Sequence, residues 1–301
     1  MSKKMQSNIL LLITTIIWGS AFVAQKAGAE IGGFTFGGIR TFIGGLVLIP
    51  VILLMNKGKE NSIFKPEQGE LKKRSIFGGI CCGVVLFVAS TLQQFGVAFT
   101  TAGKAGFITT LYVVFVPLIG LVIGKKIRPI MWLCVILGCT GLYLLCMTDA
   151  SFSLSKGDTL VLLCALGFSF HILVVDHFAP ICDGVLMSCI QFLVAGAIGI
   201  ICMFIFEEPV LKDILSCWLP ILYAGVLSCG IGYTFQILAQ KHAEPTVASL
   251  IMSLESVFAA ISGAILLHET MIPRELIGCL VIFSAVIISN LPEKNNKLED
   301  K

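Results

Sequence analysis

Apolar residues run along this chain in stretches of about 20 residues, and short polar segments separate the stretches. An α-helix of that length crosses the hydrocarbon core of a bilayer, which is ~30 Å thick. Because lipid offers the backbone no hydrogen-bond partner, these runs predict helices; strands of a membrane barrel would be shorter and half polar. We predict ten transmembrane helices, at about residues 8–25, 34–54, 75–98, 102–124, 130–147, 157–176, 183–206, 217–240, 245–268 and 272–291.

Composition favours the same class of protein. Of the 301 residues, 56% are hydrophobic and only 13% are charged, whereas a soluble domain of this size would carry more charge. The net charge of +3 comes from short basic loops between the predicted helices, so we predict no nucleic-acid partner. The twelve cysteines form no C-x-x-C pair, which indicates packing and not metal or redox chemistry. We predict no metal site and no cofactor.

The chain contains an internal repeat with an offset of 143 positions. Residues 91–127 superpose on residues 234–270, and each segment covers a predicted pair of helices. The matched pairs are Thr91 with Thr234, Gln93 with Gln236, Ala105 with Ala248, Leu111 with Leu254, Phe115 with Phe258, and Gly120 with Gly263. We therefore predict a first repeat of five helices at residues 1–147, a second at residues 157–291, and a tail at residues 292–301.

The basic residues predict how the chain crosses the membrane. With the N-terminus inside, fifteen lysines and arginines fall in cytoplasmic segments and five on the opposite side. Because five helices per repeat is an odd number, the second repeat must run upside down relative to the first. We predict an all-α polytopic membrane protein whose ten helices form a 5+5 inverted-topology repeat, with both termini cytoplasmic, in a cell membrane of the bacterial inner-membrane type. Inverted repeats are the architecture of alternating-access secondary transporters, which bind substrate near the midplane.

Several sequence segments resemble one transporter family. They are WGSAF in the first predicted helix, IRTFIGG in the second, FVPLIGLVIG in the fourth, and SLESVFAAISGAILLHE followed by ELIGCLVIFSAVIIS in the last two. Together they look like the EamA-type branch of the drug/metabolite transporter superfamily. The first repeat departs from the pattern, since Lys125 and Lys126 stand where the second has His268 and Glu269 and where the family often keeps an acid. The resemblance implies a ten-helix transporter, frequently an exporter of amino acids, other small metabolites or toxic compounds.

Polar residues inside the predicted helices are the candidates for a site, because each costs free energy in hydrocarbon. Glu255 is the strongest, since it lies near the middle of its helix, where an acid costs about 2.5–3.5 kcal/mol on insertion scales. A carboxylate there binds a proton, a cation or a substrate amine, or else makes a structural hydrogen bond to a neighbouring helix. The repeat superposes Glu255 on Tyr112, so we predict that these two side chains face one another.

Arg40 and His171 are further candidates, each with more than one interpretation. The Arg40 guanidinium holds a substrate carboxylate, snorkels to the membrane surface or ties two helices together, and its repeat mate Gln191 favours a polar lining at that face. His171 either titrates near neutral pH or is a satisfied structural histidine. For the remaining candidates interhelical packing and substrate contact stay equally open; they are Trp18, Ser20, Gln93, Tyr233 and Gln236.

The sequence favours a secondary active transporter among three classes of function. The four histidines lie singly at different depths, which disfavours a membrane-embedded enzyme, and no Walker A sequence is present to bind ATP. A channel is the third class. We predict a small-molecule exporter in the lipid bilayer, coupled to protons through Glu255, acting as a monomer or homodimer. Arg40 with Glu255 suits a zwitterion such as an amino acid, whereas the aromatic residues suit an organic cation in a multidrug efflux carrier.

Overall fold

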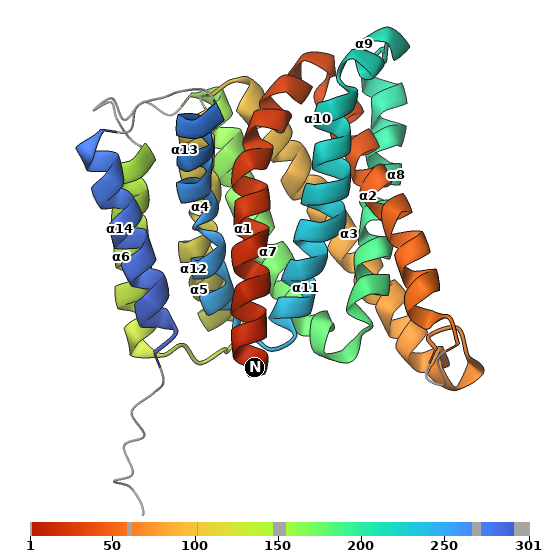
Figure 1. The fold of residues 1–301 in the computed structure, drawn as a ribbon, viewed down its shortest axis with the longest axis horizontal. Helices are drawn as coiled ribbons and strands as arrows, with labels where there is room; N and C mark the ends of the chain where they lie inside the picture. Colours follow the sequence, from red (N-terminus) through yellow and green to blue (C-terminus); the bar gives the residue numbers. More distant parts are fainter. Residues whose placement is uncertain (1, 59–61, 101, 147–154, 267–271, 292–301) are drawn as a thin grey trace, which may run out of the picture.

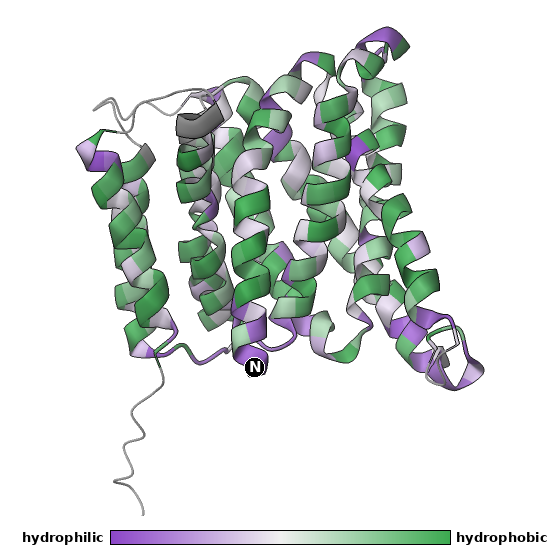
Figure 2. Ribbon diagram, viewed as in Figure 1, coloured by the Kyte–Doolittle hydropathy of each residue, from purple (hydrophilic) through white to green (hydrophobic). Residues whose placement is uncertain are grey.

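The computed structural model describes residues 2–58, 62–100, 102–146, 155–266 and 272–291, and within them the chain is helical with no strand. The helices run along one common direction between two ends of a bundle (Figure 1). Apolar residues cover the helices and polar ones gather at both ends (Figure 2). Over the described residues, eight helical segments are long and apolar enough to cross a membrane, and Pro129–Leu145 is a shorter apolar helix.

The helices follow the order of the predicted segments. In the first half they are α1 (Lys3–Gly28), α2 (Gly33–Asn56), α3 (Gly69–Ala98), α4 (Ala102–Thr110), α5 (Tyr112–Val122) and α6 (Pro129–Cys146). In the second half they are α7 (Lys156–Phe178), α8 (Gly184–Phe206), α9 (Leu211–Ser216), α10 (Trp218–Leu222), the π-helix η4 (Tyr223–Tyr233), α11 (Thr234–Gln240), α12 (Pro245–Met252), α13 (Glu255–Leu266) and α14 (Pro273–Ser289). The all-helical class is confirmed, and the count of ten transmembrane helices stays a prediction.

Two helices begin earlier than the apolar runs predict. The helix α1 starts at Lys3 because the Ser2 side chain caps it by accepting from the Met5 amide. The helix α3 starts at Gly69, five residues before Arg74, because charged side chains at a membrane surface do not interrupt a helix. Hydropathy marks the buried part of a membrane helix and misses such polar turns.

Two helices are broken at equivalent positions of the repeat. The break between α4 and α5 lies at Leu111, and the break between α12 and α13 lies at Ser253 and Leu254. At both breaks a tighter turn replaces the α-helical pattern: the Leu111 amide donates to the Ile108 carbonyl at 3.2 Å, and the Leu254 amide donates to the Ile251 carbonyl at 3.1 Å. Discontinuous helices of this kind form the binding sites of many transporters.

A third irregular segment is the π-helix η4, which joins α10 to α11. Two side chains of α1 donate to its carbonyls: Thr14 Oγ1 to Gly232 O at 3.0 Å and Trp18 Nε1 to Ser228 O at 3.3 Å. On the other side, a Cβ on Gly225 would lie 2.8 Å from the Arg40 carbonyl, so only glycine allows α2 to approach this closely. The segment therefore packs between α1 and α2, in keeping with the frequent use of π-turns at functional sites.

Glycines also bring the two halves of the chain together. A Cβ on Gly38 of α2 would lie 2.8 Å from the backbone of Gly199 on α8, and a Cβ on Gly141 of α6 would lie 2.7 Å from the Gly278 carbonyl on α14. The pair α6 and α14 stands at one edge of the bundle (Figure 1). These contacts leave the backbones as close as small residues allow, the usual way in which membrane helices associate.

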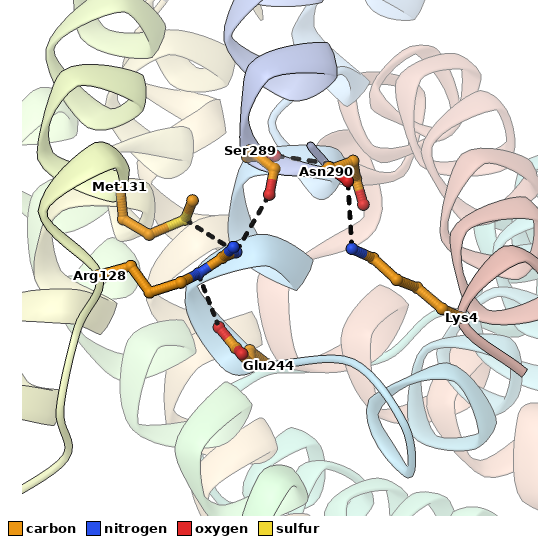
Figure 3. A network of polar contacts seen from close by, with 6 residues as sticks. All are labelled: Lys4, Arg128, Met131, Glu244, Ser289 and Asn290. Atoms are coloured by element: carbon orange, nitrogen blue, oxygen red, sulfur yellow. Dashed lines mark hydrogen bonds and ion pairs between the residues drawn. The ribbon is translucent and has the colours of Figure 1, made fainter. Parts of the chain in front are cut away.

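The two ends of the bundle differ in their polar contacts. At one end, here called the Lys4 end, Lys4 Nζ donates to the Asn290 carbonyl at 3.1 Å and so joins the start of α1 to the end of α14 (Figure 3). At the other, the Glu207 end, the Glu207 carboxylate accepts hydrogen bonds from the Phe34 and Thr35 amides at 2.9 and 2.7 Å. Glu207, which directly follows α8, thus caps the N-terminus of α2, where a negative charge is stabilising.

Candidate functional site

A narrow central cavity lies between the two halves and is lined from α1, α2, α3, α4, α5, α7, η4, α11, α12 and α13. Its water-accessible volume is about 40 Å³, room for roughly three water molecules. Eight of the ten side chains that the sequence proposes line it, namely Trp18, Arg40, Gln93, Tyr112, His171, Tyr233, Gln236 and Glu255.

Tyr112 and Glu255 meet in this cavity. The Tyr112 hydroxyl donates to Glu255 Oε1 at 3.1 Å, which confirms that the two equivalent positions face one another. Both side chains are buried, and both follow directly after the helix breaks, as the first residues of α5 and α13. The first turn of a helix favours a carboxylate, so the break at Leu254 provides Glu255 with a polar environment in an apolar protein.

Arg40 brings a positive charge to the same cavity from α2. The residue is 5% exposed, and its guanidinium lies over the Phe36 ring at 5.3 Å from the centroid. Within the described part of the chain, Arg40 has no carboxylate partner, and its buried Nε lacks a hydrogen bond. A buried guanidinium without an acceptor is costly, so this group is suited to an anionic part of a ligand.

His171 lines the cavity with one ring nitrogen in use. Its Nε2 lies 3.1 Å from Gln191 Oε1, and because that oxygen only accepts, Nε2 carries the hydrogen. Its Nδ1 is then an acceptor, buried and without a partner among the described residues. Gln191, which the sequence places at the polar lining near Arg40, instead lies behind His171 and orients its ring.

The aromatic residues form one wall of the cavity. The ring centroids of Trp18 and Tyr233 lie 4.5 Å apart, and the ring of His171 packs edge-on against Tyr233 at 5.8 Å. Arg40 and Glu255 line the same cavity as Tyr233. Ser20 does not join this wall, because α1 turns its hydroxyl towards Tyr223, to which it is hydrogen-bonded.

The repeat identifies two further lining residues that hydropathy alone does not reveal. Three pairs of positions related by 143 residues line the cavity from opposite halves: Gln93 with Gln236, Thr109 with Met252, and Tyr112 with Glu255. Thr109 and Met252 stand three residues before Tyr112 and Glu255, one helical turn away, so the repeat could have predicted them. Gln25 and Ser228 had no such signal, since Gln25 ends a predicted helix and Ser228 has no polar repeat mate.

A second and larger cavity, the vestibule, opens at the Lys4 end with a water-accessible volume of about 580 Å³. Lys125 is ion-paired with Asp176 beside it. Arg128 donates to the Ser289 carbonyl at 3.1 Å and lies 3.9 Å from Glu244 (Figure 3). The charged lining residues are Lys125, Lys126, Arg128, Asp176, Lys241 and Glu244, so cations outnumber anions. His268 and Glu269, the repeat mates of Lys125 and Lys126, lie outside the described residues.

The vestibule and the central cavity are one helical turn apart. Three helices line the cavity with one residue and the vestibule with the residue four positions later: Tyr112 and Val116 on α5, Ile172 and Asp176 on α7, Gln236 and Gln240 on α11. A turn of α-helix rises about 5.4 Å, so this layer is thin. Towards the Glu207 end, α1 and α3 are joined by hydrogen bonds from Gln94 Nε2 to the Gln25 carbonyl at 3.0 Å and from Lys26 Nζ to the Val97 carbonyl at 3.2 Å.

Over the part of the chain that the structure describes, no three His, Cys, Asp or Glu side chains are grouped as metal ligands would be. The polar groups of the central cavity are instead single donors and acceptors on different helices, as in a site that holds a small polar molecule by several hydrogen bonds.

Comparison with known proteins agrees with the geometry. The EamA-like transporter family matches residues 5–147 and again residues 155–291. An uncharacterized transporter of Archaeoglobus fulgidus is 27% identical over 297 residues, covering 96% of this chain and 87% of that protein. The uncharacterized transporter YoaV of Bacillus subtilis is 24% identical over 298 residues, covering 96% of this chain and 98% of its own.

Two further proteins extend the comparison. A WAT1-related chloroplastic protein of Arabidopsis thaliana is 24% identical over 305 residues, covering 95% of this chain and 70% of that protein. A solved crystal structure with 17% sequence identity superposes with a TM-score of 0.75 over 94% of this chain and 96% of its own, which shows a shared fold. With two matches to one family model and full-length relatives, the chain belongs to the EamA-like transporter family and carries its domain twice.

Proposed function

We propose that this multi-pass membrane protein is a secondary active transporter that exports small amine-bearing metabolites, amino acids or related compounds, by alternating access. The family is one of transporters, and no ATP-binding sequence is present to drive transport. The observation that carries the proposal is the central cavity, in which Glu255 and the unpaired Arg40 supply one negative and one positive charge.

The two charges favour a zwitterionic substrate. Arg40 is a bidentate donor whose buried Nε has no partner among the described residues, and a substrate carboxylate provides two acceptor oxygens in the matching geometry. Glu255 accepts from Tyr112 through one oxygen and is suited to accept from a substrate ammonium through its carboxylate. A ligand with both groups satisfies two buried ions that are otherwise costly to hold in a membrane protein.

The unequal ends of the bundle favour alternating access. The vestibule reaches to within one helical turn of the central cavity at the Lys4 end, whereas hydrogen bonds join α1 to α3 towards the Glu207 end. The positive-inside bias supports a cytoplasmic position for the Lys4 end. In this arrangement a cytoplasmic substrate enters the vestibule, reaches Glu255 and Arg40, and leaves when the opposite end opens, as an inverted repeat allows.

Glu255 is also the group proposed to couple transport to protons. It is the acid of the central cavity, so proton binding there and ammonium binding there compete for the same oxygens. Competition for one site is sufficient for exchange, because a carrier that moves only when Glu255 is occupied exports one amine for each proton that enters. The Tyr112 hydroxyl donates to the carboxylate and orients it towards either partner.

The test is transport by the purified full-length protein in liposomes, screened against a metabolite library with and without an inward proton gradient. We expect saturable, gradient-dependent movement of compounds that carry an ammonium and a carboxylate. Movement of library compounds that does not saturate would identify a channel. Failure of every amine-bearing compound to move would contradict the proposal.

An organic-cation efflux carrier is the second candidate, because the Trp18 and Tyr233 rings form a wall that could hold a cation by its ring faces. The two candidates differ in what Arg40 does. A buried guanidinium repels a substrate that has only positive charge, whereas it attracts a carboxylate. Adding lipophilic cations without a carboxylate to the same screen separates the candidates.

A further inference from the structure

Two buried glutamines connect a backbone carbonyl to the central cavity. Gln240 Nε2 donates to the Ile172 carbonyl on α7 at 3.0 Å, and Gln236 Nε2 donates to Gln240 Oε1 at 2.9 Å. Gln240 is 2% exposed and Gln236 is 1% exposed. Gln236 lines the central cavity, and Gln240 lines the vestibule one turn further along α11.

This chain of hydrogen bonds has a fixed direction. A backbone carbonyl only accepts, so the atom of Gln240 that faces Ile172 must be its nitrogen. The amide oxygen of Gln240 then faces Gln236, and Gln236 donates to it through its own nitrogen. As a result the remaining atom of the Gln236 amide, Oε1, is turned away from Gln240 as an acceptor.

The last atom of this series of hydrogen bonds lacks a partner. Gln236 Oε1 is buried and unpaired among the described residues. Burying an acceptor without a hydrogen bond costs about 1–3 kcal/mol unless a ligand donates to it. Two other lining residues share this property, because Gln25 Oε1 and His171 Nδ1 are also buried acceptors without a described partner. With the Glu255 carboxylate, the cavity presents four acceptors, a set that a group rich in N–H bonds would satisfy.

We propose that Gln240 is a positioning residue that holds Gln236 Oε1 as an acceptor for the ammonium N–H of the substrate, and that the transporter thereby selects primary amines over their trimethylated analogues. The proposal rests on the function proposed above and adds its selectivity. A trimethylammonium group has the same charge but no N–H, so it leaves Gln236 unsatisfied while Glu255 still attracts it. Gln240 itself does not contact the substrate and acts through Gln236.

The experiment uses two matched pairs of probes: leucine with its N,N,N-trimethyl betaine, and ethanolamine with choline. Purified full-length protein is titrated with each, and the concentration that gives one fixed rise in melting temperature is measured. For the wild type, we expect at least one pair in which the trimethylated member requires about tenfold more, the size of one hydrogen bond to a charged group. Binding of neither pair, or equal binding within both, would overturn the proposal.

Substitutions at Gln240 test the direction of the hydrogen bonds that join Gln236, Gln240 and Ile172. Gln240→Met keeps the length of the side chain but frees Gln236 to rotate, so the preference should fall to about twofold or less, since the bond to the charged group is no longer enforced. Gln240→Glu keeps an acceptor for Gln236 Nε2 in both protonation states, because a carboxyl group and a carboxylate each offer an oxygen at that position. The preference should therefore be retained in this variant, and its loss would contradict the proposal.

Gln94→Met is the matched control. Gln94 is a buried glutamine, 1% exposed, that donates to the Gln25 carbonyl and is not among the cavity-lining residues. The Gln94→Met variant loses a similar hydrogen bond and should keep the wild-type preference for the primary amine over its trimethylated analogue. If Gln240→Met also keeps it, the proposal is wrong although transport itself stands. If the liposome screen finds no transported amine, the proposed function fails instead.

Discussion

At the scale of single residues, Glu255 and Arg40 are the two charged side chains that line the central cavity. Many polar side chains elsewhere in the described helices have partners, as Thr14 has Gly232 and Ser188 has Thr234. Arg40 has a buried Nε without a described partner, and Glu255 accepts from the Tyr112 hydroxyl. Buried charges need a compensating partner, so these two residues are the natural points of contact for a charged substrate.

The first prediction concerns Arg40→Gln. Loss of the guanidinium removes a charge-assisted hydrogen bond worth about 1.5–3 kcal/mol, so KM for a zwitterionic substrate should rise by about 10- to 150-fold. The KM for lipophilic cations, which Arg40 repels, should not rise. The measurement is initial transport rate against substrate concentration in liposomes. Arg74→Gln, an exposed arginine at the start of α3, serves as control and should leave KM unchanged. An unchanged KM in Arg40→Gln would remove Arg40 from the site.

At the scale of elements, glycine contacts determine how closely the helices pack. Two adjacent glycines on α2 provide a matched comparison. A Cβ on Gly38 would meet the backbone of Gly199 and Ile200 at 2.8 Å, whereas a Cβ on Gly37 would meet nothing within 4 Å.

The second prediction follows from this difference. Gly38→Ala should destabilise the protein by about 1–3 kcal/mol, because backbone on α8 must move to admit the methyl group. Gly37→Ala should be neutral or stabilising by about 0.5–1 kcal/mol, since alanine loses less entropy in a helix. Thermal unfolding in detergent measures both. Equal melting temperatures would show that α2 and α8 do not pack as described.

The helical elements were predictable from sequence, and their irregularities were not. Apolar runs indicate where a helix is buried in lipid, so the segments and their order follow from hydropathy alone. The breaks at Leu111 and Leu254 replace an α-helical turn by a tighter one, and side chains of α1 satisfy carbonyls of the π-helix η4. No local composition records either feature. The Tyr112–Glu255 contact was nevertheless predictable, because the repeat relates the two positions. The roles of Ser20 and Gln191 were not, since helix rotation decides which way a side chain points.

At the scale of the whole molecule, the two ends of the bundle carry different charges. The start of α1, the end of α14 and the basic connection between α2 and α3 lie at the Lys4 end, and Glu207 lies at the other (Figure 1). This distribution is the one that an inverted repeat with cytoplasmic termini would produce.

The third prediction is the orientation of the chain. On a background with the native cysteines removed, Lys65→Cys should react with a membrane-impermeant thiol reagent only after the cells are opened. Glu208→Cys should react in intact cells, because its exposed side chain lies at the Glu207 end. Glu208 is preferred to Glu207, which caps α2. The reverse labelling pattern would rule out the orientation and the route from vestibule to cavity.

Glu255→Gln tests the central claim most directly. The amide keeps the shape of the side chain and still accepts a hydrogen bond from Tyr112, but it cannot ionise, so it can neither bind a proton nor compensate a substrate ammonium. The variant and the control Glu208→Gln, an exposed acid away from the cavity, are compared in liposomes with and without an imposed pH gradient, beside their melting curves. We expect Glu255→Gln to stay folded and to lose all gradient-driven transport, while the control retains it. Gradient-driven transport at the wild-type rate by Glu255→Gln would contradict the account.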